Sequence, residues 1–182
     1  HFGTCGGCKT QNLSYDEQLN QKSNQVEDAF HRLGGFQDFK LDHIVGADPV
    51  FNYRNKMEFT FSPHRWVLET EPEGVDRSVA VCLRIPGRYD IILDIKECHI
   101  QPTIGNKIMK VAREVCLAHP DLKPYDPKTH IGFLRFLMLR FGVNTNQIMV
   151  NLVTAYDDLN KLSPLIDALL EQVPEITSMV NN

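Results

Sequence analysis

The sequence has no long apolar run. Its 182 residues are 42% hydrophobic, an ordinary proportion for a globular protein. No stretch approaches the ~20 consecutive apolar residues that a membrane-spanning helix requires. The N-terminus also lacks the charged and apolar regions of a secretory signal. Both absences argue against a membrane protein and against a secreted one.

The sequence also lacks an excess of basic residues. Lys and Arg number 19 against 23 Asp and Glu, so the formal net charge is −4. Free nucleic-acid-binding domains usually carry a basic face and often a basic balance. Any contact with a polyanion must therefore use a local patch, or a partner domain outside this chain.

Nucleotide-binding loops are absent as well. No glycine-rich turn joins a strand to a helix as dinucleotide-binding folds require, and there is no phosphate loop. These 182 residues are therefore predicted to contain no nucleotide-cofactor fold of their own.

Cysteine is present, but not in the pattern of a disulfide framework. The five cysteines are an odd number without regular spacing, in a chain that is not small. A reducing cytoplasm is therefore predicted, with metal binding favoured over disulfides. The residues are Cys5, Cys8, Cys82, Cys98 and Cys116.

Cys5 and Cys8 form a Cys-x-x-Cys pair on a loop that Gly6 and Gly7 make compliant, so they can chelate one metal centre. Four interpretations are open. A thioredoxin-like redox pair would follow a strand, and no strand precedes this one. A zinc ribbon would show a second such pair. An iron–sulfur cluster needs three or four thiolates, which can be distant in sequence; a coincidental pair is the remaining alternative.

Cys98 favours the cluster interpretation. It follows a predicted strand and precedes a predicted helix, in charged and polar surroundings that would present its side chain at a sheet edge. Cys82 and Cys116 have apolar neighbours instead, and both are predicted to be core thiols.

The hydrophobic periodicity predicts an α+β fold with a mainly antiparallel sheet and helices packed on it. The first helix is expected to be capped by Ser14 and to stop at Gly34-Gly35, and the last is expected to open at Ser163-Pro164. The other expected elements are strands at 51–62, 66–69, 78–85 and 90–95, a helix at 102–119, a hairpin of 133–141 with 147–154, and the start of a strand at 175–180.

The first of these strands alternates clearly. The alternation places Phe51 and Tyr53 on the buried face and Arg54 and Lys56 together on the opposite one. Two outward cations can hold phosphates, and arginine can also stack on a base. A solvated face balanced by Glu58 is the alternative interpretation.

Arg135 and Arg140 interrupt an otherwise apolar strand. Five residues apart, they should point to opposite faces of the sheet. Because a buried unpaired guanidinium is expensive, at least one of them is expected to meet a partner or a ligand.

Several segments, taken together and in this order, resemble the S-adenosylmethionine-dependent RNA (uracil-5-)-methyltransferases. Those enzymes make 5-methyluridine in bacterial 23S ribosomal RNA and in transfer RNA. The first segment is His-Phe-Gly-Thr-Cys-Gly-Gly-Cys at 1–8, followed by Gln11, Tyr15 and a helix with Gln18 and Lys22. The others are Tyr-Arg-Asn-Lys-Met-Glu-Phe at 53–59 and the runs at 132–135, 149–154 and 176–180.

The resemblance implies a 4Fe–4S cluster. Cys5, Cys8 and Cys98 match the last three cysteines of the family's four-cysteine pattern. The first cysteine would lie two residues before His1, so this chain is expected to supply three of the four metal ligands.

The resemblance also implies that the chemistry lies elsewhere. In such enzymes a cysteine thiolate adds to C6 of a flipped-out uridine, C5 takes the methyl group and a carboxylate removes the C5 proton. The nucleophile, the base and the S-adenosylmethionine site are expected after Asn182, so no catalytic or cofactor-binding residue is assigned here. Arg54 is expected to contact RNA, followed by Lys56 and Lys9.

The chain is thus expected to be a cytoplasmic methyltransferase fragment, inactive alone, that contacts RNA (ribosomal rather than transfer RNA) and lacks the class I methyltransferase domain. Its expected parts are a cluster loop at 1–12, a helix at 13–35 that packs on the missing domain, and a central RNA-contacting α+β domain at 36–182. A stand-alone iron–sulfur or zinc RNA-binding module without catalysis is the alternative.

Overall fold

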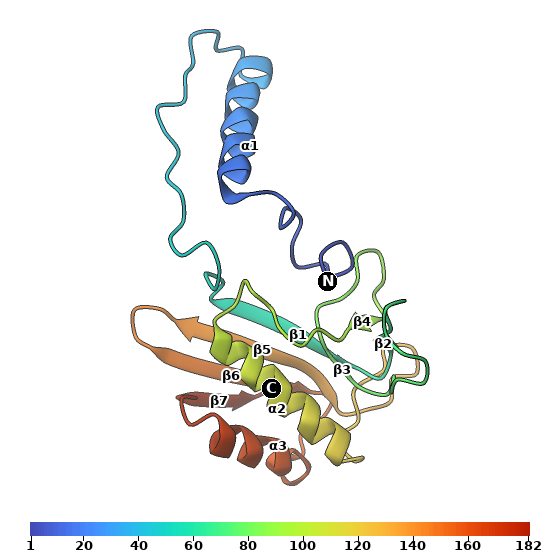
Figure 1. Cartoon of the computed structure of the whole chain (residues 1–182). Helices are drawn as coiled ribbons and strands as arrows, with labels where there is room; N and C mark the ends of the chain where they lie inside the picture. The colour runs from blue at the N-terminus through green and yellow to red at the C-terminus, as the bar shows by residue number, and fades with distance from the viewer.

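The computed structural model describes all residues from 1 to 182. It shows a body built on a five-stranded sheet and an N-terminal arm that extends away from it (Figure 1). The elements are α1 (Tyr15–Asp28), a π-helical turn (Ala29–Leu33), β1 (Lys56–Ser62), β2 (Arg65–Trp66), β3 (Ala80–Cys82), β4 (Ile92–Leu93), α2 (Thr103–Ala118), β5 (Leu134–Gly142), β6 (Gln147–Thr154), α3 (Leu159–Gln172) and β7 (Ser178–Asn181).

The main sheet has the strand order β3-β1-β5-β6-β7. Its pairs are antiparallel except for β6 with β7, which run parallel. The predicted hairpin is confirmed as β5 and β6, and Asn146 adopts a φ of +51° in the turn between them. The prediction of an α+β fold with a mainly antiparallel sheet is also confirmed.

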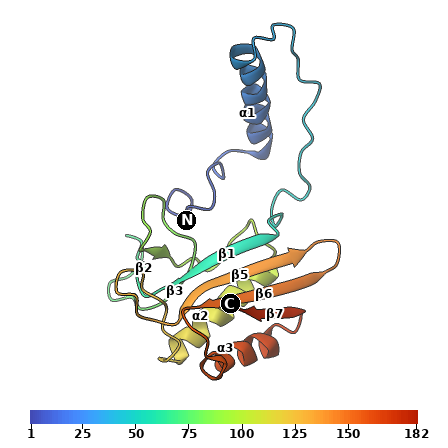
Figure 2. The same ribbon diagram turned by 180° about the vertical axis from the view of Figure 1, so that it is seen from behind.

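Helices α2 and α3 cover one face of the sheet, and the opposite face is open (Figures 1 and 2). On β1, Met57, Phe59 and Phe61 alternate inward and are fully buried. Helix α2 meets them with an apolar stripe, and α3 contributes a second stripe at helical spacing. No helix of the chain has the length and apolar character needed to cross a membrane.

The strand predicted at 51–62 begins only at Lys56. Asn52 adopts a left-handed φ of +59°, and the N–H groups of Asn52 and Arg54 donate to the carbonyls of His99 and Ile100 instead of to a neighbouring strand. The predicted burial of Phe51 and Tyr53 is therefore wrong, because these side chains are 51% and 59% exposed. The predicted alternation of buried and exposed residues holds within β1, but Phe51 and Tyr53 lie before the strand begins.

The other short strands also differ from the prediction. The predicted return strand at 66–69 is only Arg65–Trp66, and it pairs parallel with β4 instead of folding back on β1. Strands β3 and β4 lie inside the predicted ranges but cover only a few residues each.

Helix α3 begins earlier than predicted, at Leu159. Asp158 is its N-cap, and its carboxylate accepts a hydrogen bond from the backbone N–H of Lys161 at 3.0 Å. Pro164 therefore lies inside the helix, where it cannot donate to the carbonyl of Asn160. The hydroxyl of Ser163 donates to that carbonyl at 3.0 Å instead, so the helix continues past the proline.

The prediction that Arg135 and Arg140 point to opposite faces is wrong. The register between β5 and β6 shifts between Leu134 and Phe136. Because of this irregularity, Arg135 and Arg140 are both exposed. The guanidinium of Arg135 lies over the ring of Tyr125, 4.9 Å from its centroid. One of the two thus meets an aromatic partner, as a cation–π pair on the surface.

The arm consists of residues 9–50, with α1 at its centre. Ser14 caps the helix as predicted, accepting from Glu17 N at 3.3 Å, and the helical run ends at Leu33. The left-handed residue that follows is Gly35, with a φ of +72°, rather than Gly34. Helix α1 buries no residue against the body, so its packing on a methyltransferase domain stays a prediction.

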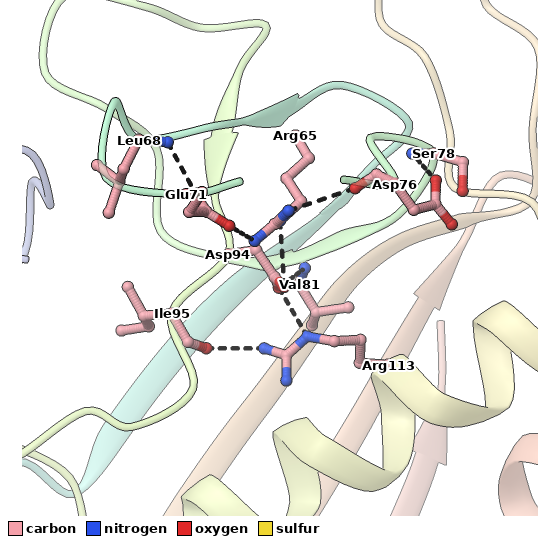
Figure 3. Close-up of polar contacts among 9 residues, drawn as sticks. All are labelled: Arg65, Leu68, Glu71, Asp76, Ser78, Val81, Asp94, Ile95 and Arg113. Atoms are coloured by element: carbon pink, nitrogen blue, oxygen red, sulfur yellow. Dashed lines mark hydrogen bonds and ion pairs between the residues drawn. The ribbon is translucent and has the colours of Figure 1, made fainter. Parts of the chain in front are cut away.

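An ion network joins β2 and the loop after it to the segment after β4 and to helix α2 (Figure 3). The carboxylate of Asp94 lies 2.6 Å from Nε of Arg113 and 3.5 Å from Nε of Arg65. Arg113 also donates to the carbonyl of Ile95 at 2.7 Å, and Arg65 pairs with Glu71. The network holds the short strands β2 and β4 against the body, where few backbone hydrogen bonds are available.

Candidate functional site

A groove of about 490 Å³ lies where the arm meets the body. We call it the arm groove. It is bounded by the cysteine loop, the first turns of α1, the returning chain at 47–53 and one residue of the body. The lining residues are Gly7, Cys8, Lys9, Thr10, Gln11, Leu13, Ser14, Tyr15, Gln18, Lys22, Ala47, Val50, Phe51, Tyr53 and Ile100. Two of the predicted site residues, Cys8 and Lys9, are among them.

The cysteine loop lies directly on the segment that follows β3. A Cβ atom on Gly6 would lie 2.7 Å from the carbonyl oxygen of Arg84, and one on Gly7 would lie 2.8 Å from Cδ1 of Leu83. Both glycines are therefore needed for the close approach of the loop to the body. Cys5 and Cys8 are partly buried as a result and pack against the hydrophobic core.

The third predicted metal ligand, Cys98, is buried and rigidly held. Its backbone N–H donates to Oδ1 of Asn106 at 2.9 Å, and Nδ2 of Asn106 donates back to its carbonyl at 3.3 Å. Nε2 of Gln101 also donates to Oδ1 of Asn106, at 2.7 Å. One side chain of α2 thus fixes both backbone groups of Cys98.

Sequence reasoning missed Asn106 and Gln101. A polar residue in the first turns of an otherwise amphipathic helix is an ordinary surface feature in a sequence, and only the folded chain shows that it reaches back to Cys98. The complete burial of Gln101 is equally invisible, because glutamine is usually exposed.

The pKa values of two of the clustered thiols, Cys8 and Cys82, are raised. Burial raises the pKa of Cys8, and the nearby charges of Cys98 and Cys5 raise it further. Burial is also the main reason why the pKa of Cys82 rises to about 12, with smaller contributions from Cys5 and Cys98. Cys82 and Cys116 are buried in the core, which confirms the prediction for both.

The structure therefore gathers Cys5, Cys8 and Cys98 in one region, but it does not bring them to one point. No three His, Cys, Asp or Glu side chains are arranged to hold a single metal ion. The donor type fits a thiolate-bound centre, while the geometry of the loop does not form one. The metal site stays a prediction.

Arg54 is placed beside this region by backbone hydrogen bonds. The N–H groups of Asn52 and Arg54 donate to the carbonyls of His99 at 2.9 Å and Ile100 at 2.8 Å. The guanidinium of Arg54 acts to lower the pKa of Cys8, against the larger effect of burial. Its side chain is exposed, and its Nε donates to the carbonyl of Lys56 at 3.2 Å.

Lys56 lies apart from the arm groove. It is exposed on β1, in register with Arg140 of β5, on the open face of the sheet. The structure thus brings Arg54, Lys9 and the cysteines to one region and leaves Lys56 on a neighbouring surface. Their predicted contacts with RNA stay predictions.

Known proteins are similar to this chain along nearly all of its length. No family model matches it. A protein of Porphyromonas gingivalis named uncharacterized RNA methyltransferase is 38% identical over 99% of the chain and 40% of its own length. One of Chlorobaculum tepidum with the same kind of name is 34% identical over 96% of the chain and 37% of its own length. The chain therefore spans about 40% of the relatives it matches.

A solved structure is also similar. The tRNA (uracil-54, C5)-methyltransferase of Pyrococcus abyssi, in complex with S-adenosyl-L-homocysteine, matches with a TM-score of 0.62 and 25% sequence identity. The match covers 88% of this chain and 34% of that one. Most of this chain is thus similar in fold to about a third of that larger protein.

Proposed function

Because the chain is similar along nearly its whole length to one part of larger RNA methyltransferases, we propose that it is the RNA-contacting part of an enzyme that methylates C5 of uridine with S-adenosylmethionine. The likeness to a uracil-C5 methyltransferase structure carries the proposal. The substrate is a bacterial ribosomal RNA; transfer RNA, which the Pyrococcus abyssi enzyme's name specifies, is the alternative.

We propose a division of labour among three parts of the chain. Residues 1–12 form the cluster loop, the helix at 13–35 packs on a methyltransferase domain, and residues 36–182 contact RNA. We assign no catalytic residue and no S-adenosylmethionine ligand to these residues, so the chain alone is inactive. A methylation assay with separate ribosomal and transfer RNA, on the full-length protein, tests the reaction and the substrate together.

Arg54 is the residue whose loss should weaken RNA binding most directly. Replacing Arg54 with alanine in the full-length protein should lower affinity for the substrate RNA about ten-fold, the usual cost of an arginine contact with a nucleic acid. The melting temperature should not change, because the guanidinium is exposed and makes only one hydrogen bond, to a neighbouring carbonyl.

Arg77→Ala is the matched control, since Arg77 is also exposed and its side chain makes no ion pair. Filter binding measures the affinity, and thermal unfolding measures the stability. A drop in melting temperature that parallels the loss of affinity would contradict a direct contact.

Cys5, Cys8 and Cys98 are proposed to supply thiolates to a 4Fe–4S cluster, which needs at least one ligand more. Such a centre transfers electrons or orders the loop that carries it. Support for the proposal comes from the gathering of the three thiols beside the core and from the hydrogen bonds that fix Cys98.

The full-length protein, purified without oxygen, should contain roughly four irons and four sulfides per chain and absorb broadly in the visible range. Cys98→Ser should lose the metal, whereas Cys116→Ala should keep it, because Cys116 is a core thiol of α2. Zinc instead of iron, or no metal in the unaltered protein, would favour a plain RNA-binding module.

A further inference from the structure

The lining of the arm groove carries positive charge, whereas the chain as a whole carries a net negative charge. The chain carries more acidic than basic residues, yet no Asp or Glu lines the groove. Lys9 and Lys22 do line it, both are exposed, and neither takes part in an ion pair. A concave surface with cations and no carboxylate attracts an anionic ligand.

The groove also carries aromatic rings that the fold leaves exposed. Phe51 and Tyr53 flank Asn52, and both line the groove. Their backbone is fixed, because the N–H groups of Asn52 and Arg54 donate to the carbonyls of His99 and Ile100 in the body. The rings are therefore exposed on a segment that is tied to the body, which is the arrangement of a surface that stacks bases.

The opposite wall of the groove belongs to the arm and is also ordered by hydrogen bonds. The hydroxyl of Tyr15 accepts from the N–H of Ala47, which ties α1 to the returning chain. The side chain of Gln18 accepts from the hydroxyl of Thr10 at 3.2 Å and donates to the carbonyl of Leu13 at 3.1 Å. The volume of about 490 Å³ lies within the range of roughly 300–1,000 Å³ that small-molecule sites occupy.

We propose that the arm groove holds one unstacked nucleotide of a single-stranded RNA segment, with its base against Phe51 or Tyr53 and its phosphate near Lys9 and Lys22. The inference rests on the proposed function and adds to it the strandedness of the RNA and three residues, Phe51, Tyr53 and Lys22. A duplex does not suit the site, because paired and stacked bases do not offer their faces to aromatic side chains.

The test uses the full-length protein and two labelled RNA probes of equal length, one a uridine-rich single strand and the other a duplex. Fluorescence anisotropy should show tighter binding of the single strand. Replacing Phe51 and Tyr53 together with leucine keeps apolar bulk but removes the rings, and it should weaken single-strand binding at least ten-fold, as expected for a lost stacking contact. Replacing Tyr53 with tryptophan should preserve binding.

Matched controls separate the groove from the general surface. Tyr89→Leu removes an exposed aromatic ring that does not line the groove, and it should leave affinity unchanged. Lys22→Ala should weaken binding and reduce its salt dependence by about one phosphate contact, whereas Lys107→Ala, on the exposed side of α2, should do neither.

The outcomes distinguish the inference from the function on which it rests. If Arg54→Ala weakens RNA binding but the double leucine variant does not, the protein binds RNA and the groove inference is overturned. Equal or tighter binding of the duplex overturns it too. If the unaltered protein binds neither RNA, both the groove inference and the proposed function fail; a peptide segment is then the occupant to test.

Discussion

Replacing Asp94 with alanine should lower the free energy of unfolding by about 3 kcal/mol, because the change leaves two guanidinium groups without their shared carboxylate. The side chains of Asp94, Arg65 and Arg113 are only 12–14% exposed, so water can replace the lost partner only in part. Arg113 would keep its bond to the carbonyl of Ile95, and Arg65 would keep Glu71. Urea denaturation at neutral pH measures the effect.

Glu114→Ala is the matched control for this change. Glu114 forms an ion pair with Lys110 at 3.8 Å on the surface of α2, where both side chains are more than half exposed. Its removal should cost less than about 0.5 kcal/mol. If the two variants lose the same stability, the network around Asp94 behaves as a surface pair and does not hold β2 and β4 to the body.

Replacing Gly132 with alanine should cost roughly 3–4 kcal/mol, the sum of a strained backbone and an overpacked contact. Gly132 has a φ of +123°, and an added Cβ would lie 2.2 Å from the carbonyl oxygen of Pro124 and 2.6 Å from Cα of Tyr125. Backbone hydrogen bonds hold the two segments together on both sides of this contact, since Phe133 N donates to Lys123 O and Tyr125 N donates to Leu134 O. The chain therefore cannot move apart to admit the methyl group.

Gly87→Ala separates the two causes. Gly87 also has a positive φ, of +77°, but its added Cβ would have no atom within 4 Å. It should cost only the conformational penalty, about 1 kcal/mol. A thermal or urea unfolding curve for each variant makes the comparison. If both variants lose the same free energy of unfolding, the close approach of Pro124 does not contribute to the cost of Gly132→Ala.

The elements that local patterns determine were predictable from the sequence. Helix α2, the hairpin of β5 with β6 and the buried alternation of Met57, Phe59 and Phe61 all follow from periodicity over many residues. Strands β2 and β4 have two residues each, and they exist because distant segments and the Asp94 network position them. The sequence predicts strands near both positions, but not their short length or their parallel pairing with each other.

The errors have local physical causes. Phe51 and Tyr53 flank the left-handed residue Asn52 and precede the start of β1, so they are exposed although their spacing matches the buried residues that follow. The hydroxyl of Ser163 replaces the donor that Pro164 lacks, so a residue pair that usually opens a helix lies inside one.

The candidate site was predictable only where its residues form a motif. Cys5 and Cys8 stand out by spacing, and Arg54 by its place in an alternating segment. Asn106 carries no such signal, because it is an ordinary polar residue on a helix. Its role depends on its contacts with Cys98, which only the folded chain shows.

The short segment from Cys98 to Gln101 has two attachments at once. Asn106 of α2 holds the segment on one side through its hydrogen bonds to Cys98. On the other side, the carbonyls of His99 and Ile100 accept hydrogen bonds from the N–H groups of Asn52 and Arg54. The sulfur of Cys98 and the exposed rings of the groove are thus mechanically coupled through a few backbone atoms. We therefore expect a displacement of Cys98, by oxidation or by a bound group, to shift Phe51, Tyr53 and Arg54 as well.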